Sequence, residues 1–169
     1  MNRIVYLHGY KSSPRSTKAQ FFGRHFAELR VPFKVPDISA ETIAGPLRVI
    51  EDACRGEAVT LMGSSLGGYL AALYAARHPE VQRVILMAPA FCIGRMDLIK
   101  DASQFEDFPD VRQPVLILHG TEDPVVPVSL SQAFAASHPK AKLLLLNSGH
   151  ELTDVLEPMW NATLEFLTL

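Results

Sequence analysis

One short stretch strongly constrains how this chain can fold. Gly63-Ser64-Ser65-Leu66-Gly67 lies between a short apolar run, residues 58–62, and an alanine-rich run, residues 66–76. The first run predicts a buried strand and the second a helix. A serine in a sharp turn between the two brings the positions two before and two after it close together, where side chains would collide. Glycine at both positions fits a turn centred on Ser65, so we predict that its hydroxyl stands clear of a sheet.

Length and composition limit the possible architectures and partners. The chain has 169 residues, of which 48% are hydrophobic and 20% charged, with a formal net charge of -2. This length suits one hydrophobic core, so we expect residues 1–169 to form a single domain. Because the chain lacks the basic excess that holds phosphate backbones, we expect no nucleic-acid partner. The sequence does not indicate an oligomeric state.

The cysteines and the apolar runs predict neither a metal site nor a segment that binds or crosses a membrane. Cys54 and Cys92 have no companion cysteine or histidine at metal-ligand spacing, so we expect two reduced packing thiols and no metal site. The apolar runs at residues 4–7 and 143–146 are too short for a signal peptide or a membrane span. We therefore expect a cytoplasmic protein that does not bind membranes.

Strand and helix patterns alternate along the chain. Short apolar runs predict strands at residues 3–7, 33–35, 58–62, 84–87, 115–118 and 143–146. Amphipathic or alanine-rich patterns predict helices at residues 19–29, 43–54, 66–76, 129–137 and 155–167. The last three strand runs are continuously apolar, as a parallel sheet covered on both faces requires. We expect a three-layer α/β/α sandwich around a mostly parallel sheet of about six strands, ordered 2-1-3-4-5-6.

The interval 92–113 interrupts this alternation, because it contains no long helical pattern. A connection of this length is usually functional or mobile. Two interpretations remain open, a small lid over the site or a segment that simply covers the sheet. Its candidates for lining a substrate pocket are the apolar residues Met96, Leu98, Phe105 and Phe108.

Two further side chains complete a catalytic arrangement around Ser65. A serine hydroxyl needs a base to take its proton and an acid to orient that base. His150 lies in the loop directly after the run at 143–146, and Asp123 follows the run at 115–118 with Pro124 after it to fix the turn. Chemistry in parallel sheets gathers at the carboxyl ends of strands, where both loops must lie. We predict that Asp123 is the acid and His150 the base.

Acyl transfer also needs hydrogen-bond donors for the oxyanion that forms on the substrate, each contributing about 3 to 4 kcal/mol to lowering the barrier. The backbone N–H of Leu66, directly after the serine, is one candidate. The second is the N–H of Tyr10, which Gly9 allows to turn inward. His8 either hydrogen-bonds this loop or is a core histidine with its partners satisfied.

These motifs together resemble the α/β-hydrolase superfamily. The resemblance rests on His8-Gly9, Gly63-Ser64-Ser65-Leu66-Gly67-Gly68, His119-Gly120 with Asp123, and Ser148-Gly149-His150. More narrowly, Tyr6-Leu7-His8-Gly9-Tyr10 with Ser12-Ser13-Pro14, and the Gly63–Tyr69 motif, look like a group of small bacterial esterases whose members often lack a large cap. The resemblance implies hydrolysis of small carboxylic esters or acyl thioesters, with neither a metal nor an organic cofactor.

Three functional hypotheses follow from this pattern. The first is a serine esterase or thioesterase that forms an acyl-enzyme at Ser65. The second is a hydrolase of the same fold that attacks amides, lactones or carbon-carbon bonds. The third is a catalytically silent binding module, since a fold does not determine function. The short chain favours small or open-ended substrates.

Overall fold

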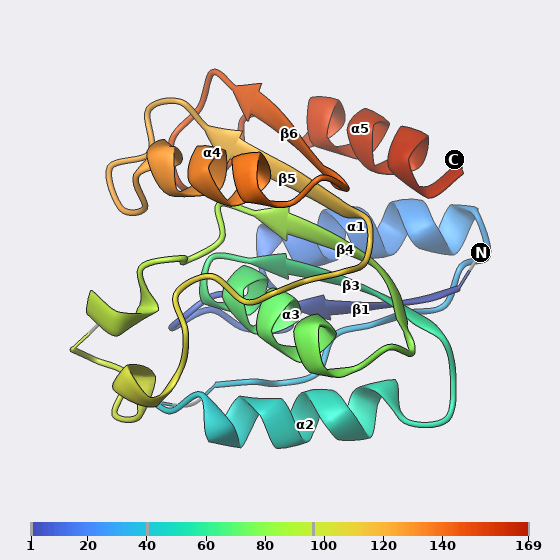
Figure 1. Cartoon of the computed structure of the whole chain (residues 1–169). Coiled ribbons are helices and arrows are strands. Elements are labelled where there is room, and N and C mark those ends of the chain that lie inside the picture. Colours follow the sequence, from blue (N-terminus) through green and yellow to red (C-terminus); the bar gives the residue numbers. More distant parts are fainter. Residues whose placement is uncertain (1, 40, 96, 169) are drawn as a thin grey trace.

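A parallel sheet forms the centre of the protein (Figure 1). The computed structural model describes residues 2–39, 41–95 and 97–168. In these ranges the sheet has six strands in the order β2-β1-β3-β4-β5-β6, and every pairing is parallel. The strands are β1 (Arg3–Leu7), β2 (Phe33–Lys34), β3 (Val59–Ser64), β4 (Val81–Met87), β5 (Val115–Gly120) and β6 (Ala141–Leu146). The predicted parallel sheet and its strand order are confirmed.

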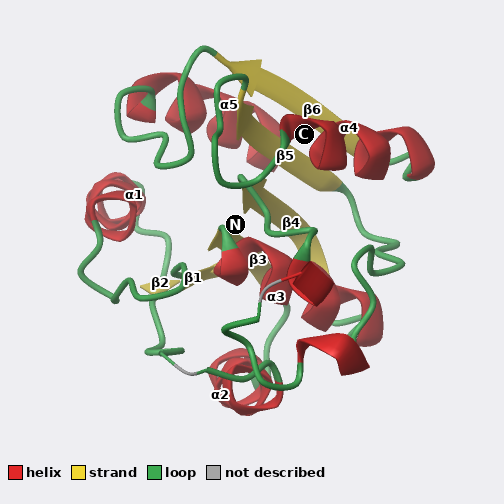
Figure 2. Cartoon of the chain, turned by 90° about the vertical axis from the view of Figure 1, so that its left-hand side faces the viewer, coloured by secondary structure: helices red, strands yellow, loops and turns green. Residues whose placement is uncertain are grey.

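Helices cover both faces of the sheet, which confirms the three-layer sandwich (Figure 2). The α-helices of the described ranges are α1 (Thr17–Glu28), α2 (Ala44–Cys54), α3 (Leu66–Arg77), α4 (Val128–Ser137) and α5 (Leu156–Thr168). One core lies under α1 and α5, where Phe22, Phe26 and Trp160 pack beside Met62. The other core lies under α2, α3 and α4.

Helix α3 is buried along almost its whole length, from Leu66 to Ala75. Its small alanine side chains let the helix lie close against the sheet. Ala71 and Ala72 are fully buried against this face. The close packing places the start of α3, directly after Ser65, at the carboxyl ends of the central strands.

Strand β6 is more exposed than the sequence predicts. Leu144 and Leu145 are 37% and 41% exposed, because β6 is an edge strand whose neighbour in the described sheet is β5. The prediction that this strand is buried on both faces was wrong. A continuous apolar run does not distinguish an edge strand from a central one.

The 92–113 connection contains two short 3-10 turns, Ile93–Arg95 and Ala102–Gln104, and packs against the helical layer. The carboxylate of Asp101 accepts hydrogen bonds from the N–H groups of Ile43 at 2.6 Å and Ala44 at 3.0 Å. The Tyr69 hydroxyl donates to the Glu106 carbonyl at 2.6 Å. These contacts tie the connection to α2 and α3.

No helix among the described residues is both long and apolar enough to cross a membrane. Within the same ranges, no three His, Cys, Asp or Glu side chains come together in an arrangement that could hold a metal ion.

Candidate active site

Ser65 occupies a strained turn between β3 and α3. Its φ is 54° and its ψ is -116°, a conformation that residues with side chains rarely adopt. The surrounding backbone holds it there, because the Ser65 N–H donates to the Met87 carbonyl at 2.8 Å. The Ser65 carbonyl accepts from the N–H groups of Tyr69 and Ala90, both at 3.1 Å. The predicted sharp turn is therefore present.

Neither of the two glycines of the turn, Gly63 and Gly67, could be replaced by a residue with a side chain without a steric clash. A Cβ atom added to Gly63 would overlap the backbone of Gly67, as the sequence argument requires. A Cβ added to Gly67 would overlap the carbonyl oxygens of Leu7 and His8 at the end of β1. Glycine at position 67 thus also lets α3 start directly against β1.

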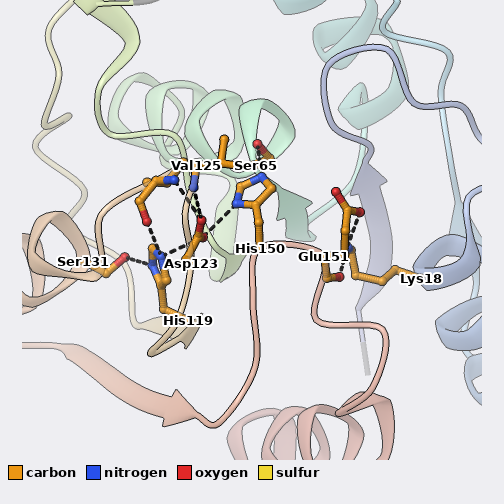
Figure 3. A network of polar contacts seen from close by, with 9 residues as sticks. Lys18, Ser65, His119, Asp123, Val125, Ser131, His150 and Glu151 are labelled. Atoms are coloured by element: carbon orange, nitrogen blue, oxygen red, sulfur yellow. Dashed lines mark hydrogen bonds and ion pairs between the residues drawn. The ribbon is translucent and has the colours of Figure 1, made fainter.

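The structure brings the three predicted side chains together at the carboxyl ends of the strands (Figure 3). His150 Nε2 lies 3.0 Å from Ser65 Oγ, and His150 Nδ1 lies 2.7 Å from Asp123 Oδ2. Because an ionised carboxylate only accepts hydrogen bonds, we assign the imidazole hydrogen to Nδ1. Nε2 is then free to accept the hydrogen of the serine hydroxyl.

The Asp123 side chain is completely buried and firmly held. Its Oδ1 accepts hydrogen bonds from the N–H groups of Val125 and Val126, both at 2.8 Å. Burial acts to raise the pKa of this carboxyl, but the hydrogen bonds from Val126, His150 and Val125 outweigh burial and lower it. Asp123 therefore stays ionised and keeps His150 oriented.

His119, which is not among the residues predicted for the site, also reaches Asp123. This buried histidine places Nε2 3.1 Å from Asp123 Oδ2 and 3.0 Å from the Val126 carbonyl, while Nδ1 lies 2.7 Å from Ser131 Oγ. Since both neighbours of Nε2 are acceptors, Nε2 carries the hydrogen and Nδ1 accepts from the Ser131 hydroxyl. Burial lowers the pKa of His119, and the Val126 carbonyl and Asp123 oppose that effect. Its position near the end of β5, four residues before Asp123, is the feature of the sequence that could have indicated this contact.

The loop after β1 lies directly beside Ser65. A Cβ added to Gly9 would be 3.5 Å from Ser65 Cβ. His8 is buried beneath this loop, where Nδ1 donates to the Gly9 carbonyl at 3.0 Å and Nε2 accepts from the Ile38 N–H at 3.2 Å. His8 is thus both a loop partner and a satisfied core histidine.

The two predicted oxyanion donors border the same hollow. Leu66 is the first residue of α3, and the first N–H groups of a helix have no partner within it. Tyr10 and Leu66 both line a hollow of about 260 Å³. A larger cavity of about 440 Å³ lies beside it and contains Ser65 and His150. The Tyr10 loop forms a wall of both.

Three of the predicted pocket residues of the 92–113 connection, Leu98, Phe105 and Phe108, do not line these two spaces. Leu98 and Phe108 are 58% and 42% exposed, and the Phe105 ring lies 5.6 Å from the Arg77 guanidinium. Contrary to the prediction, the loop after β1 and the start of α1 form the walls, because the connection packs outward over α3. Met96 lies outside the described residues.

Comparison with solved structures shows that the chain shares its fold with several hydrolases. A putative hydrolase of the α/β superfamily from Xanthomonas campestris pv. campestris is 24% identical, with a TM-score of 0.82, and 99% of each chain is covered. Est1E from Butyrivibrio proteoclasticus is 18% identical, with a TM-score of 0.82 over 99% of this chain and 89% of that chain. Mouse alpha/beta hydrolase domain-containing protein 10 is 19% identical, with a TM-score of 0.82 over 98% of this chain and 88% of that one.

A family model also matches more than half of the sequence. The model describes an uncharacterised protein family, UPF0227, and matches residues 3–104. This range includes β1, the Tyr10 loop, the turn at Ser65 and all of α3. The chain therefore belongs to the UPF0227 family, and its fold is that of the α/β-hydrolases.

Proposed function

We propose that this protein is a serine hydrolase that cleaves small carboxylic esters or acyl thioesters through an acyl-enzyme on Ser65. The observation that carries the proposal is the continuous hydrogen-bonded path from Ser65 Oγ through His150 to Asp123. The strained turn supports it, because such strain persists where function requires a residue in one position. The fold neighbours include a structure of Est1E with ferulic acid and the lipolytic enzymes LipS and LipT, which supports an ester substrate.

Each group has a defined task in this mechanism. His150 Nε2 takes the proton of Ser65 as the serine oxygen attacks the substrate carbonyl carbon. Asp123 holds the imidazole in the required tautomer and stabilises the imidazolium that forms. The N–H groups of Leu66 and Tyr10 receive the oxyanion. His150 then protonates the leaving alcohol or thiol, the acyl group stays on Ser65, and water activated by His150 releases it.

The two hollows fit small substrates. One part of an ester would occupy the cavity of about 440 Å³ at Ser65, and the other would occupy the hollow of about 260 Å³ beside Leu66. Amides, lactones and carbon-carbon bonds are alternative targets of the same triad. A silent binding module is disfavoured, because simple binding does not need a strained serine in line with a base and an acid.

Labelling with a fluorophosphonate probe, followed by peptide mapping, tests this function. We expect one adduct, on Ser65, because its hydroxyl lines a cavity beside a histidine that a carboxylate orients. The adduct should be absent in Ser65→Ala and strongly reduced in His150→Ala, while His78→Ala, at the far end of α3, serves as the control. Ser65→Ala should lower kcat on short-chain 4-nitrophenyl esters at least about ten-thousand-fold.

The opposite result would be equally clear. If the wild-type protein is folded by circular dichroism but shows neither an adduct nor turnover of esters and thioesters, the hydrolase proposal fails and the binding module takes its place.

A further inference from the structure

A buried lysine lies on the wall of the cavity that contains Ser65. Lys18, in the first turn of α1, is only 7% exposed. It lines the same cavity of about 440 Å³ as Ser65 and His150, and Figure 3 shows its side chain reaching toward the loop that carries His150. Lysine is almost never buried without a partner that compensates its charge, so the position needs an explanation.

The contacts of Lys18 compensate its charge only in part. Its ammonium group donates a hydrogen bond to the Glu151 carbonyl, and the Glu151 carboxylate lies 3.9 Å away. That carboxylate is 80% exposed, so water screens its attraction to the lysine. Burial lowers the pKa of Lys18, and Glu151 offsets this effect only partly. An ammonium group has three N–H donors, and within the described residues both recorded partners belong to Glu151.

The remaining wall of the cavity favours a negative charge. Lys11 adds a second ammonium group, which lies 5.5 Å from the Tyr10 ring centre. Ser12 and Ser16 add hydroxyl groups to the lining, whereas the Tyr6 hydroxyl is buried against Ser16 and Ser64. Glu151 is the carboxylate among the lining residues, whereas Asp123 lies behind His150 and does not line the cavity. Two ammonium groups and one carboxylate leave a single positive charge beside the nucleophile.

We propose that this cavity binds a carboxylate of the substrate, with Lys18 as its main partner. The preferred substrates are then esters or thioesters whose acyl or alcohol part carries a carboxylate a few bonds from the scissile carbonyl. A monoanion balances the single positive charge, whereas the Glu151 carboxylate would repel a phosphate dianion. This inference rests on the proposed hydrolase function and names the substrate class of that site.

Matched charged and neutral esters test this inference. Monomethyl glutarate and the methyl ester of glutaramic acid differ only in a carboxylate on the acyl side. The pair 4-acetoxybutanoate and 4-acetoxybutanamide differs in the same way on the alcohol side. We expect wild-type kcat/KM to favour the charged member of at least one pair by about tenfold or more, as a charge-assisted hydrogen bond in a sheltered cavity provides.

Variants of Lys18 and Lys34 test whether Lys18 causes the preference for the charged ester. Lys18→Met removes the charge and keeps the length of the side chain, and should lower the charged-to-neutral ratio of kcat/KM by about ten- to a hundredfold. Lys18→Arg should retain a preference for the charged ester. Lys34→Met makes the same charge change on β2, outside the cavity, and should leave the ratio unchanged.

Three outcomes would overturn the inference. An unchanged ratio in Lys18→Met would mean that Lys18 only anchors the His150 loop through Glu151. Equal rates for charged and neutral esters in the wild type would remove the carboxylate site but leave the hydrolase function intact. Absence of all turnover together with absence of an adduct on Ser65 would overturn both proposals. If Lys18→Met does not fold, the charged-to-neutral ratio of kcat/KM in the wild type, and its decrease in Lys11→Met, which removes the second ammonium group of the cavity, test the inference instead.

Discussion

At the scale of single residues, His119 connects the acid of the candidate triad to helix α4. Its imidazole lies between Asp123 and the Ser131 hydroxyl, with a further contact to the Val126 carbonyl. All of these groups are held away from water. His119 therefore restrains the carboxylate that orients His150, although it does not line the cavity that contains Ser65. We interpret it as a positioning residue.

The lowered pKa of His119 predicts a defined dependence of stability on pH. An unfolded chain protonates this histidine as the pH falls below about 6.5, whereas the folded protein resists protonation until a lower pH. The contribution is therefore fully present above about pH 6.5 and is lost progressively between that value and the lowered pKa, with a slope of at most about 1.4 kcal/mol per pH unit. We would measure the free energy of unfolding in urea between about pH 4.5 and 8, a range that spans histidine titration. Its dependence on pH should be flatter in His119→Gln than in the wild type. Identical profiles would contradict the assignment.

At the scale of elements, the contact between β1 and α3 depends on Gly67. The carbonyl oxygens of Leu7 and His8 occupy the space into which a side chain at this position would project. These are backbone atoms at the end of a central strand, which is paired with β2 and β3, and of the residue directly after it, so they cannot move aside as a flexible side chain could. The elbow is therefore part of the core packing as well as of the site.

Gly67→Ala should be strongly destabilising for this reason. We expect the free energy of unfolding to fall by about 3 kcal/mol or more, measured by urea denaturation. Gly23→Ala in α1 is the matched control, since its added Cβ would lie at an ordinary 3.4 Å from the Phe33 ring. The control should be neutral or gain up to about 1 kcal/mol, because alanine favours helices over glycine. Equal stability of the two variants would refute the close-packing argument.

At the scale of the whole molecule, the 92–113 connection joins parts of the chain that are far apart in sequence. The N-cap residue of α2, Ile43, makes no side-chain capping bond. Thr42 Oγ1 accepts from the Gly45 N–H at 3.2 Å, and the Asp101 carboxylate accepts from the N–H groups of Ile43 and Ala44. Glu106 pairs with Arg77 at 3.2 Å at the other end of the connection. We propose that the connection is a fixed covering segment rather than a lid.

Asp101→Ala separates these two roles. Loss of the cap should lower the free energy of unfolding by about 1 kcal/mol. If the connection is a fixed cover remote from Ser65, kcat/KM for short 4-nitrophenyl esters should change less than about twofold, because residues that are far apart couple only weakly in energy. A large change in kcat with little loss of stability would instead support a lid.

Much of the architecture and of the candidate triad was predictable because it depends on local patterns. The alternation of apolar runs and amphipathic stretches placed all six strands and five helices of the described chain in the right order. Ser65 comes directly after β3, and Asp123 and His150 lie three and four residues past the ends of β5 and β6. Their convergence follows from the rule that carboxyl ends of parallel strands share one edge. The sequence by itself therefore determined the fold class, the strained turn and the three side chains that meet there.

The tertiary structure decided everything that depends on how those elements pack against one another. Lys18 meets Glu151, Asp101 caps α2, and His119 contacts Ser131 only after helices and loops have taken their final positions. The exposure of β6 and the residues that line the cavity also belong here. Such contacts join residues with no periodic relation in the sequence, so a local pattern carries no signal for them. The three residues of the candidate triad were thus readable from the chain, whereas the charge of the cavity beside them was set by the packing of α1 and the loop after β6.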